Sequence, residues 1–398
     1  MTSSNVLIIY NGTILTPDKT IPDGVVVIRD GKILDIGARG DLEEPAGASR
    51  IDAQNKYIAP GFIDIHVHGS YGADVMDASI DSFRKMSDFF VTRGVTAFLA
   101  TALTMPDDDF IRILECVRGI RANGNLPGAE VLGVHMEGPY LSVEQKGCHP
   151  VELLVNPKPD HYRPFLEYND VLREMTLAPE LEGAPDLVRH LRGAGVLPAA
   201  GHTNGIVREL MPAIDAGISH AVHFFCNMGG FRRDRLKRVA GAMETILYDD
   251  RLTTELIADG WHIGDTVMKL TVKVKGVDRV AFVTDAMTAA GMPPGRYFIG
   301  NVEAIVEDGI ARLPDNTAYA SSVTTMDVCV RNGVNRMELS LLDAVRMASL
   351  TPAQIIGVSD RKGSLERGKD ADILIIDGEV NVLATLARGR LCFSKDQE

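Results

Sequence analysis

Residues 61–69 read GFIDIHVHG, a short apolar stretch in which three polar residues alternate with apolar ones. Side chains of a β-strand alternate between its two faces, so Asp64, His66 and His68 point one way and the apolar residues between them the other. Two imidazoles two residues apart on one face can bind the same metal ion. The glycine at 69 lets the backbone turn away. The stretch therefore predicts a strand that ends at a metal site.

Seven further segments of strand length follow, separated by amphipathic stretches with helical spacing such as residues 80–94 and 184–195. Alternating strands and helices form parallel units, and eight such units over about 290 residues predict a closed (β/α)8 barrel of the TIM type. An open doubly wound sheet would show the same alternation, but the number of strands and the positions of polar residues favour the barrel. The strand segments are 57–66, 95–101, 129–137, 173–180, 196–203, 220–225, 254–260 and 279–286.

Polar residues stand at the carboxyl ends of six of these eight segments. In a parallel barrel these ends form one rim, where the catalytic groups of such barrels lie. Polar groups are costly in apolar strands unless they are paired or bound. We therefore expect one site made from His66 and His68, Glu137, His202, His223, Asp259 with His262, and Asp285.

The donors of this set are imidazole nitrogens and carboxylate oxygens, with no cysteine. They suit Zn²⁺, and Fe²⁺, Mn²⁺, Co²⁺ or Ni²⁺ nearly as well. Four histidines and two carboxylates exceed what one four-coordinate ion needs if it keeps a position for water. The set fits two divalent ions that share a carboxylate, so we expect one or two ions per chain.

The two chain ends have the pattern of short strands. Asn11-Gly12 and Asp30-Gly31 each stand between apolar runs, which is a strong hairpin signal. Neither end has enough apolar surface for a core of its own. We expect both to build one small β-sandwich domain, from residues 1–57 and 353–398, around a barrel formed by residues 58–352.

Composition limits the class of protein. The 398 residues are 45% hydrophobic and 24% charged, which is typical of a globular chain and excludes a disordered one. The net charge of −13 argues against nucleic-acid or anionic-membrane partners. No apolar run approaches the roughly 18–20 residues of a membrane span, and the start lacks signal-peptide features. Five scattered cysteines indicate reduced thiols, so we expect a cytoplasmic protein.

The order of motifs resembles the amidohydrolase superfamily, and within it the N-acetylglucosamine-6-phosphate deacetylases. The motifs are GFIDIHVHG, HMEGPYLS, GCHP, GHTN, HFFCNM, ELIADGWH, VTDAMTAAGMPPGRY and, near the end, GSLERGKDADILIID. The resemblance covers almost the whole chain. It implies a metal-dependent hydrolase that removes acetate from N-acetylglucosamine 6-phosphate. It also implies a homodimer in which a basic residue of one subunit reaches the phosphate bound by the other.

The resemblance also implies metal ligands. His66 and His68 match the first metal pair of the two-metal members, and Glu137 matches the bridging carboxylate. His202 and His223 match the histidines of the second metal. A glutamate bridge separates this branch from superfamily members that use a carboxylated lysine.

Catalytic and substrate roles follow from the same resemblance. Asp285 matches the general acid/base, which can also touch the first metal, and His149 matches a histidine that polarises the scissile carbonyl. His262 matches a ligand of a sugar hydroxyl. Cys148 matches a position whose backbone contacts the substrate.

The phosphate motif departs from the family pattern. The family usually has H-x-x-N-A-M followed by H-R-E-P-G, whereas here Cys226 and Asn227 occupy the Asn-Ala positions and no R-E-P-G follows. Residues 232–238 instead carry five positive charges. Arginine suits phosphate better than lysine does, so we expect Arg232, Arg233 or Arg235 to contact the phosphate.

A second departure is NTAYASS at 316–322, where the family tends to have G-T-L-A-G-S. Tyr319, Ala320 and Ser321 are expected over the sugar. The two departures leave the sugar open: N-acetylgalactosamine 6-phosphate, another N-acyl amino sugar and an unphosphorylated substrate remain alternatives.

Two other functions also stay open, an N-acyl amino acid amidohydrolase and a catalytically silent barrel used as a scaffold. Filled ligand positions disfavour the scaffold. Among the remaining histidines, we expect His135 to form a hydrogen bond behind the ligands and His220 to be structural.

Overall fold

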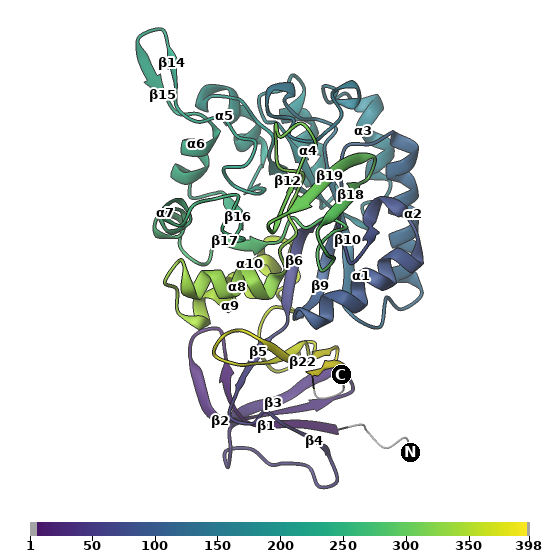
Figure 1. The fold of residues 1–398 in the computed structure, drawn as a ribbon, viewed down its shortest axis with the longest axis vertical. Coiled ribbons are helices and arrows are strands. Elements are labelled where there is room, and N and C mark those ends of the chain that lie inside the picture. Colours follow the sequence, from purple (N-terminus) through teal and green to yellow (C-terminus); the bar gives the residue numbers. More distant parts are fainter. Residues whose placement is uncertain (1–5, 396–398) are drawn as a thin grey trace.

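The computed structural model describes residues 6–395, and its larger part is a barrel of eight parallel strands (Figure 1). The strands neighbour one another in chain order, and the last approaches the first at the bridge between Val67 and Ala286. The barrel is nearly closed, which confirms the predicted fold class. Its strands are β6 (Phe62–Val67), β9 (Val95–Ala102), β10 (Glu130–Glu137), β11 (Leu172–Leu177), β12 (Leu197–Ala200), β13 (His220–Ala221), β16 (Thr253–Ile257) and β17 (Val280–Val283).

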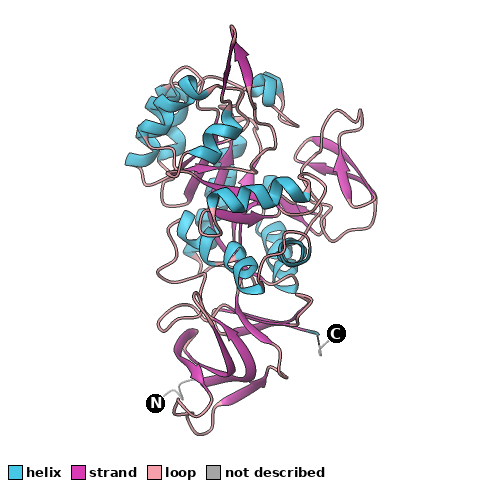
Figure 2. Ribbon diagram, turned by 90° about the vertical axis from the view of Figure 1, so that its left-hand side faces the viewer, coloured by secondary structure: helices cyan, strands magenta, loops and turns pink. Residues whose placement is uncertain are grey.

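Helices cover the outside of the barrel (Figures 1 and 2). The first, α1, begins after Ser79, whose hydroxyl accepts a hydrogen bond from the Ser82 backbone N–H. Its buried face includes Phe90, which packs edge-on against Phe98 of the barrel, with ring centroids 4.9 Å apart. The helices are α1 (Ile80–Thr92), α2 (Asp107–Ala122), α3 (Pro159–Leu166), α4 (Ala184–Gly193), α5 (Val207–Ala216), α6 (Ala242–Tyr248), α7 (Asp265–Lys275), α8 (Met326–Asn335), α9 (Leu341–Ala348) and α10 (Leu350–Ile355), with single 3-10 turns at Val75–Asp77, Val143–Gln145 and Val151–Leu153.

Both chain ends build a second sheet below the barrel (Figure 1). Hydrogen bonds join its eight strands into one continuous sheet, in the order β23-β22-β21-β5-β1-β2-β3 with β4 beside β1. The limits of the two domains stay predictions. The strands are β1 (Val6–Leu15), β2 (Thr20–Arg29), β3 (Lys32–Ala38), β4 (Ser49–Asp52), β5 (Tyr57–Pro60), β21 (Ile373–Ile376), β22 (Val382–Ala387) and β23 (Arg390–Ser394).

Of the two hairpin signals, one is right and one is wrong. Asp30-Gly31 is the turn between β2 and β3, whereas Asn11-Gly12 lies inside the continuous strand β1. There it forms an irregularity in the pairing with β2, and Asn11 has a φ of 60°. β1 pairs with β4 before this point and with β5 after it, so the irregularity changes the partner instead of reversing the chain.

The predicted strand 57–66 is two strands. β5 pairs with β1 and β21 in the small sheet, and β6 pairs with β9 in the barrel. Gly61 separates them at a close approach, because a Cβ there would lie 2.2 Å from the Thr96 Oγ1 atom. This glycine is therefore the point at which the chain passes from one sheet to the other.

Three small sheets lie outside both main sheets. β7 (Gly69–Ser70) pairs with β8 (Ala73–Asp74), and β14 (Arg232–Asp234) pairs with β15 (Lys237–Val239) in a projecting hairpin. A three-stranded sheet follows β17 and consists of β18 (Gly295–Ile299), β19 (Val302–Glu307) and β20 (Ile310–Arg312). Among the helices of residues 6–395, none combines the length and apolar character needed to cross a bilayer.

Candidate active site

A cavity of about 300 Å³ opens at the carboxyl ends of the barrel strands. Most of the predicted site residues line it, although they come from eight separate parts of the chain. Those on its wall are His68, Glu137, Cys148, His149, His202, His223, Cys226, Asn227, His262, Asp285, Tyr319 and Ser321. His66 and Ala320 are fully buried behind this wall.

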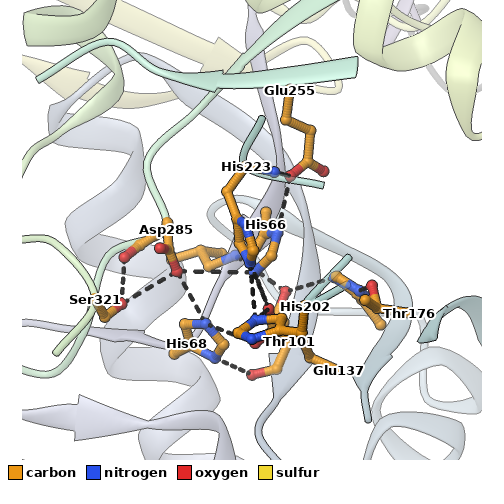
Figure 3. A network of polar contacts seen from close by, with 12 residues as sticks. His66, His68, Thr101, Glu137, Thr176, His202, His223, Glu255, Asp285 and Ser321 are labelled. Atoms are coloured by element: carbon orange, nitrogen blue, oxygen red, sulfur yellow. Dashed lines mark hydrogen bonds and ion pairs between the residues drawn. The ribbon is translucent and has the colours of Figure 1, made fainter. Parts of the chain in front are cut away.

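Glu137, the last residue of β10, lies at the centre of the predicted ligands (Figure 3). Its Oε1 atom lies 3.0 Å from the Nε2 of His202 and 2.8 Å from the Nε2 of His223. Its Oε2 atom lies 3.6 Å from the Nε2 of His68, and Oε1 is 3.6 Å from the Nε2 of His66. One carboxylate thus faces both predicted histidine pairs, as a bridging ligand would.

Three of the predicted metal ligands have strained backbones. His202, His223 and Asp285 each lie two residues beyond the end of a strand and have positive φ angles of 47°, 23° and 47°. This left-handed conformation costs of order 1–3 kcal/mol for a residue other than glycine, and it gathers at functional sites. Here it occurs where the chain leaves the barrel wall next to the cavity.

The ring orientation of three histidines suits metal binding. The Nδ1 atom of His66 lies 2.9 Å from a carboxylate oxygen of Glu255. The Nδ1 atom of His68 lies 3.1 Å from the carbonyl oxygen of Thr101. The Nδ1 atom of His202 lies 2.8 Å from the carbonyl oxygen of Gln145. Because these oxygens can only accept, each Nδ1 donates its hydrogen. Each Nε2 then faces the carboxylates of the pocket, where it can give its lone pair to a metal ion or, without an ion, carry a proton that a carboxylate accepts.

The buried donors fit a divalent metal. Among the residues that the structure describes, the Nε2 of His66 is buried without a hydrogen-bond partner. His66, His68 and Glu137 each offer one ligand atom, and these atoms lie within 4.8 Å of one another. Inward lone pairs around a buried carboxylate need a cation between them, so this part of the pocket has the donor chemistry of a metal site.

His149 has the opposite orientation. Its Nδ1 accepts a hydrogen bond from the Thr104 backbone N–H at 3.2 Å and lies 2.8 Å from the Thr104 hydroxyl. Burial lowers the pKa of His149 to about 4, so the ring is neutral and carries its proton on Nε2. That N–H points toward the Oε2 of Glu137, 3.5 Å away. This histidine is therefore arranged to donate a hydrogen bond in the pocket.

Asp285 faces the first predicted histidine pair. Its Oδ1 atom lies 3.0 Å from the Nε2 of His68 and 3.7 Å from that of His66, and it accepts a 3.2 Å hydrogen bond from the Ser321 hydroxyl. Burial by itself would raise the pKa of Asp285. The hydrogen bond from His68 and the charge of His66 outweigh burial and lower it, so the group is a carboxylate at neutral pH.

His262 and Tyr319 form one side of the cavity. Their ring centroids are 4.4 Å apart, and the Nδ1 of His262 lies 2.7 Å from the Asp259 carboxylate. The two thiols on the cavity wall are not activated: burial raises the pKa of Cys148 to about 12 and also raises that of Cys226. Neither has the lowered pKa of a nucleophilic cysteine.

The basic segment does not line this cavity. Arg232 and Arg233 lie in β14, and Arg235 is in the turn that joins it to β15. The hairpin projects from the barrel (Figure 1). Phe231 and Leu236, within the same segment, are 66% and 93% exposed. The three arginines therefore do not reach the cavity of their own chain.

The sequence analysis missed several supporting residues. Glu255 holds His66 and also accepts a 2.8 Å hydrogen bond from the His223 backbone N–H. Its charge, directly before the apolar residues Leu256 and Ile257 of a predicted strand, was a signal that could have identified it. Thr104 had no such signal, because its role depends on a contact with a residue 45 positions away. His135 lies behind the ligands, hydrogen-bonded to Thr176 at 2.7 Å.

Comparisons with known proteins show the family of the chain. Residues 57–392 match the model of the Amidohydrolase family. An N-acetylglucosamine-6-phosphate deacetylase from Bacillus subtilis is 34% identical over 97% of both chains. An N-acetylgalactosamine-6-phosphate deacetylase from Escherichia coli O157:H7 is also 34% identical, over 95% of this chain and 97% of its own.

Solved structures give the same picture. An N-acetylglucosamine-6-phosphate deacetylase from Pasteurella multocida superimposes with a TM-score of 0.91 at 30% identity, over 97% of this chain and 99% of that one. A Mycobacterium smegmatis enzyme of the same name, a variant in complex with N-acetyl-D-glucosamine-6-phosphate, gives a TM-score of 0.89 at 29% identity, over 98% of this chain and 100% of that one.

Proposed function

The chain belongs to the amidohydrolase family, and from this membership we infer that it is a metal-dependent amide hydrolase. We propose that it removes the acetyl group of N-acetylglucosamine 6-phosphate, giving acetate and glucosamine 6-phosphate. Relatives with this activity in their names are similar over nearly the full length. The observation that carries the proposal is the convergence of four histidines and two carboxylates around one cavity.

The proposed metal ligands are His66, His68, Glu137, His202 and His223, with Asp285 beside the first pair. They would hold one or two divalent ions, with zinc the best match to the donors. When bound, such an ion supplies Lewis-acid chemistry, because it acidifies water to give a nucleophile and polarises a carbonyl.

Asp285 is the proposed general acid/base. Its depressed pKa keeps it ionised at neutral pH, so it can accept the proton of the attacking water. The leaving amine needs a proton when the C–N bond breaks, and the same carboxyl group then returns it. The Ser321 hydroxyl holds the oxygen of Asp285 in place.

His149 is the proposed hydrogen-bond donor to the amide carbonyl. Negative charge develops on that oxygen as the nucleophile attacks, and a fixed N–H stabilises it. Because Thr104 occupies the Nδ1 atom, the Nε2–H is the group that His149 can offer.

The sugar is proposed to lie between the metal ligands and the outer wall of the cavity. His262, which Asp259 orients, and Tyr319 are the proposed contacts of its hydroxyls. The proposed sugar-binding side of the cavity is completed by the backbone around Ala320 and Ser321 and by Cys148, Cys226 and Asn227. The raised thiol pKa values support a contact role for the two cysteines, not a reactive one.

We propose a homodimer in which the hairpin β14–β15 of one subunit reaches the phosphate held by the other. Its five positive charges suit a phosphate, and it does not line the cavity of its own chain. Exposed Phe231 and Leu236 are suited to a protein contact, since large exposed apolar residues favour such surfaces. We further propose that the enzyme acts in the cytoplasm, where its free thiols would stay reduced.

N-acetylgalactosamine 6-phosphate is the second candidate substrate. The relative that carries this name is as similar to the chain as the Bacillus subtilis protein is. The Cys226-Asn227 pair in place of Asn-Ala changes the same wall of the cavity.

A substrate panel tests the proposal. Acetate release is measured with N-acetylglucosamine 6-phosphate, N-acetylgalactosamine 6-phosphate, unphosphorylated N-acetylglucosamine and an N-acetyl amino acid, alongside metal analysis. We expect the highest kcat/KM with N-acetylglucosamine 6-phosphate and loss of activity with a chelator. A preference for the galactosamine isomer would select the second candidate. Bound metal without turnover of any sugar would contradict both.

A further inference from the structure

We propose a cation site in the barrel interior that is separate from the proposed catalytic metal site and is formed by Glu174, His220 and Glu255. The three side chains come from β11, β13 and β16 and are all completely buried. Each offers one ligand atom, and these atoms lie within 4.8 Å of one another. None of the three lines the cavity described above.

The site lies on the far side of His66 from the cavity. The Nε2 edge of His66 faces Glu137 and Asp285, whereas its Nδ1 edge faces Glu255. Figure 3 shows Glu255 on this opposite side, next to His223. The two carboxylate oxygens of Glu255 have different partners. Oε2 accepts hydrogen bonds from the Nδ1 of His66 and the backbone N–H of His223, and Oε1 faces the Nε2 of His220.

His220 directs a ring nitrogen at two carboxylates. The Thr253 hydroxyl has one hydrogen, which it donates to the Ser219 carbonyl at 3.1 Å, so it accepts from the Nδ1 of His220 at 2.8 Å. The Nε2 of His220 then lies 3.3 Å from the Oε1 of Glu255 and 3.9 Å from the Oε1 of Glu174. Both acids therefore face the same ring nitrogen.

Glu174 is the acid of this group without a hydrogen bond of its own. Within residues 6–395, neither of its carboxylate oxygens has a hydrogen-bond partner, although the side chain is fully buried. Burial, reinforced by the charge of Glu255, raises the pKa of Glu174. A proton on Glu174 removes the cost of a buried charge but still leaves its oxygens without a hydrogen-bond partner, and a bound cation would take the place of that proton.

A divalent ion satisfies all three groups at once. A protonated His220 could donate a hydrogen bond to Glu255 at 3.3 Å, but at 3.9 Å Glu174 is too far away to accept one. A divalent ion instead balances two carboxylates and accepts the Nε2 lone pair. The separations of 3.3 and 3.9 Å are close to the roughly 3.0–3.6 Å between neighbouring ligands of a zinc-like ion.

The ion would act as a structural brace. By holding the Oε1 of Glu255, it fixes the Oε2 atom that orients His66 and the start of the His223 loop. Ligands of a metal centre are commonly fixed in this way by groups behind them. Because its ligands are completely buried, we expect the ion to enter during folding and to exchange slowly with solvent.

Metal counting tests the site. Protein from zinc-supplemented culture is treated briefly with a chelator and its zinc is measured for the natural protein, for Glu174→Gln and for the exposed control Glu182→Gln. We expect Glu174→Gln to retain one zinc equivalent less than the other two. Equal zinc in all three would overturn the proposal.

Two further measurements keep the test decisive if Glu174→Gln fails to fold. Crystals of the natural protein at the zinc absorption edge should show an anomalous peak between Glu174, His220 and Glu255, and its absence would refute the site. If the variant folds, its Tm should fall, because an ion is lost. A higher Tm would mean that the change relieved an unpartnered carboxylate, and so would also refute the site.

Discussion

At the scale of single residues, the atom that faces each Nδ1 separates the histidines of the cavity into two kinds. Carbonyl or carboxylate oxygens accept from the Nδ1 of His66, His68 and His202, which leaves their Nε2 lone pairs for a metal. The Thr104 N–H donates to the Nδ1 of His149, which makes its Nε2 a donor. Histidine can thus act either as a metal ligand or as a hydrogen-bond donor in this cavity, because the neighbouring groups select its tautomer.

The first prediction concerns the two proposed catalytic residues. His149→Ala should lower kcat about 10²–10³-fold, because one donor to the developing oxyanion is lost. Asp285→Asn should be far more severe, because it removes the proposed proton carrier. Acetate release at saturating substrate measures both, with metal content as the control. Equal and mild losses in the two variants would show that the roles are wrongly assigned.

The second prediction concerns Thr104. Thr104→Val removes the hydroxyl beside the Nδ1 of His149, so the ring should lose its fixed orientation and kcat should fall about tenfold. Thr104→Ser keeps the hydroxyl and should restore kcat, with metal content unchanged in both variants. If valine and serine variants were equally slow, the hydroxyl would not be the group that matters.

At the scale of elements, the strand ends position the site. The predicted ligands stand at or just beyond strand ends, and those that follow β12, β13 and β17 adopt left-handed backbones next to the cavity. The alternation of strands and helices in the sequence was enough to predict all eight strands. It did not reveal that residues 57–66 cross between two sheets, because that depends on the partners of β5.

The third prediction concerns the hairpin β14–β15. The double variant Arg233→Glu/Arg235→Glu should raise KM for the 6-phosphate substrate about tenfold or more, since each charged hydrogen bond contributes roughly 1.5–3 kcal/mol. KM for the unphosphorylated sugar should not change. Similar losses for both substrates would contradict a phosphate role.

Mixing subunits tests whether the hairpin acts across a dimer. Asp285→Asn subunits keep the hairpin, and the double-variant subunits keep Asp285. If the hairpin serves the partner's cavity, hybrid dimers contain one complete site and activity should return on mixing. Activity that stays at the level of the separate variants would instead mean that the hairpin serves its own chain or none.

At the scale of the whole molecule, a buried lysine joins the barrel to the small sheet. The side chain of Lys362 is fully buried, and its Nζ atom lies 2.8 Å from Glu130, 3.1 Å from Asp370 and 2.6 Å from Asp372. Glu130 begins the barrel strand β10, and the two aspartates precede β21. Burial alone would raise the pKa values of Glu130 and Asp370, but Arg361 and Lys362 lower both to about 2.

The fourth prediction follows from this network. Lys362→Met should lower the free energy of unfolding at pH 7 by about 3–5 kcal/mol, because it removes the charged partner of buried Asp372 and one partner each of Glu130 and Asp370. The surface control Lys269→Met, which loses an exposed pair with Glu338, should cost less than about 1 kcal/mol.

The effect of Lys362→Met should depend on pH. Carboxyl pKa values are lower in the folded state than in the unfolded one, so their contribution is complete above about pH 4.5 and is lost as the pH falls toward 2. The difference in Tm between the natural protein and the variant should therefore shrink over this range. A difference that stayed constant from pH 7 to pH 3 would rule out the ion pairs as its cause.

The sequence by itself determined the barrel and the chemical nature of its rim. Strand and helix periods are local properties, and polar residues at strand ends are visible without coordinates, so His66, His68, Glu137, His202, His223 and Asp285 could be named. Only the tertiary structure decided which nitrogen each ring presents, that Glu255, Glu174 and His220 meet inside the barrel, and that the basic hairpin points away from its own cavity. These facts depend on contacts between residues far apart in the chain, and no local pattern encodes the partner of a buried polar atom.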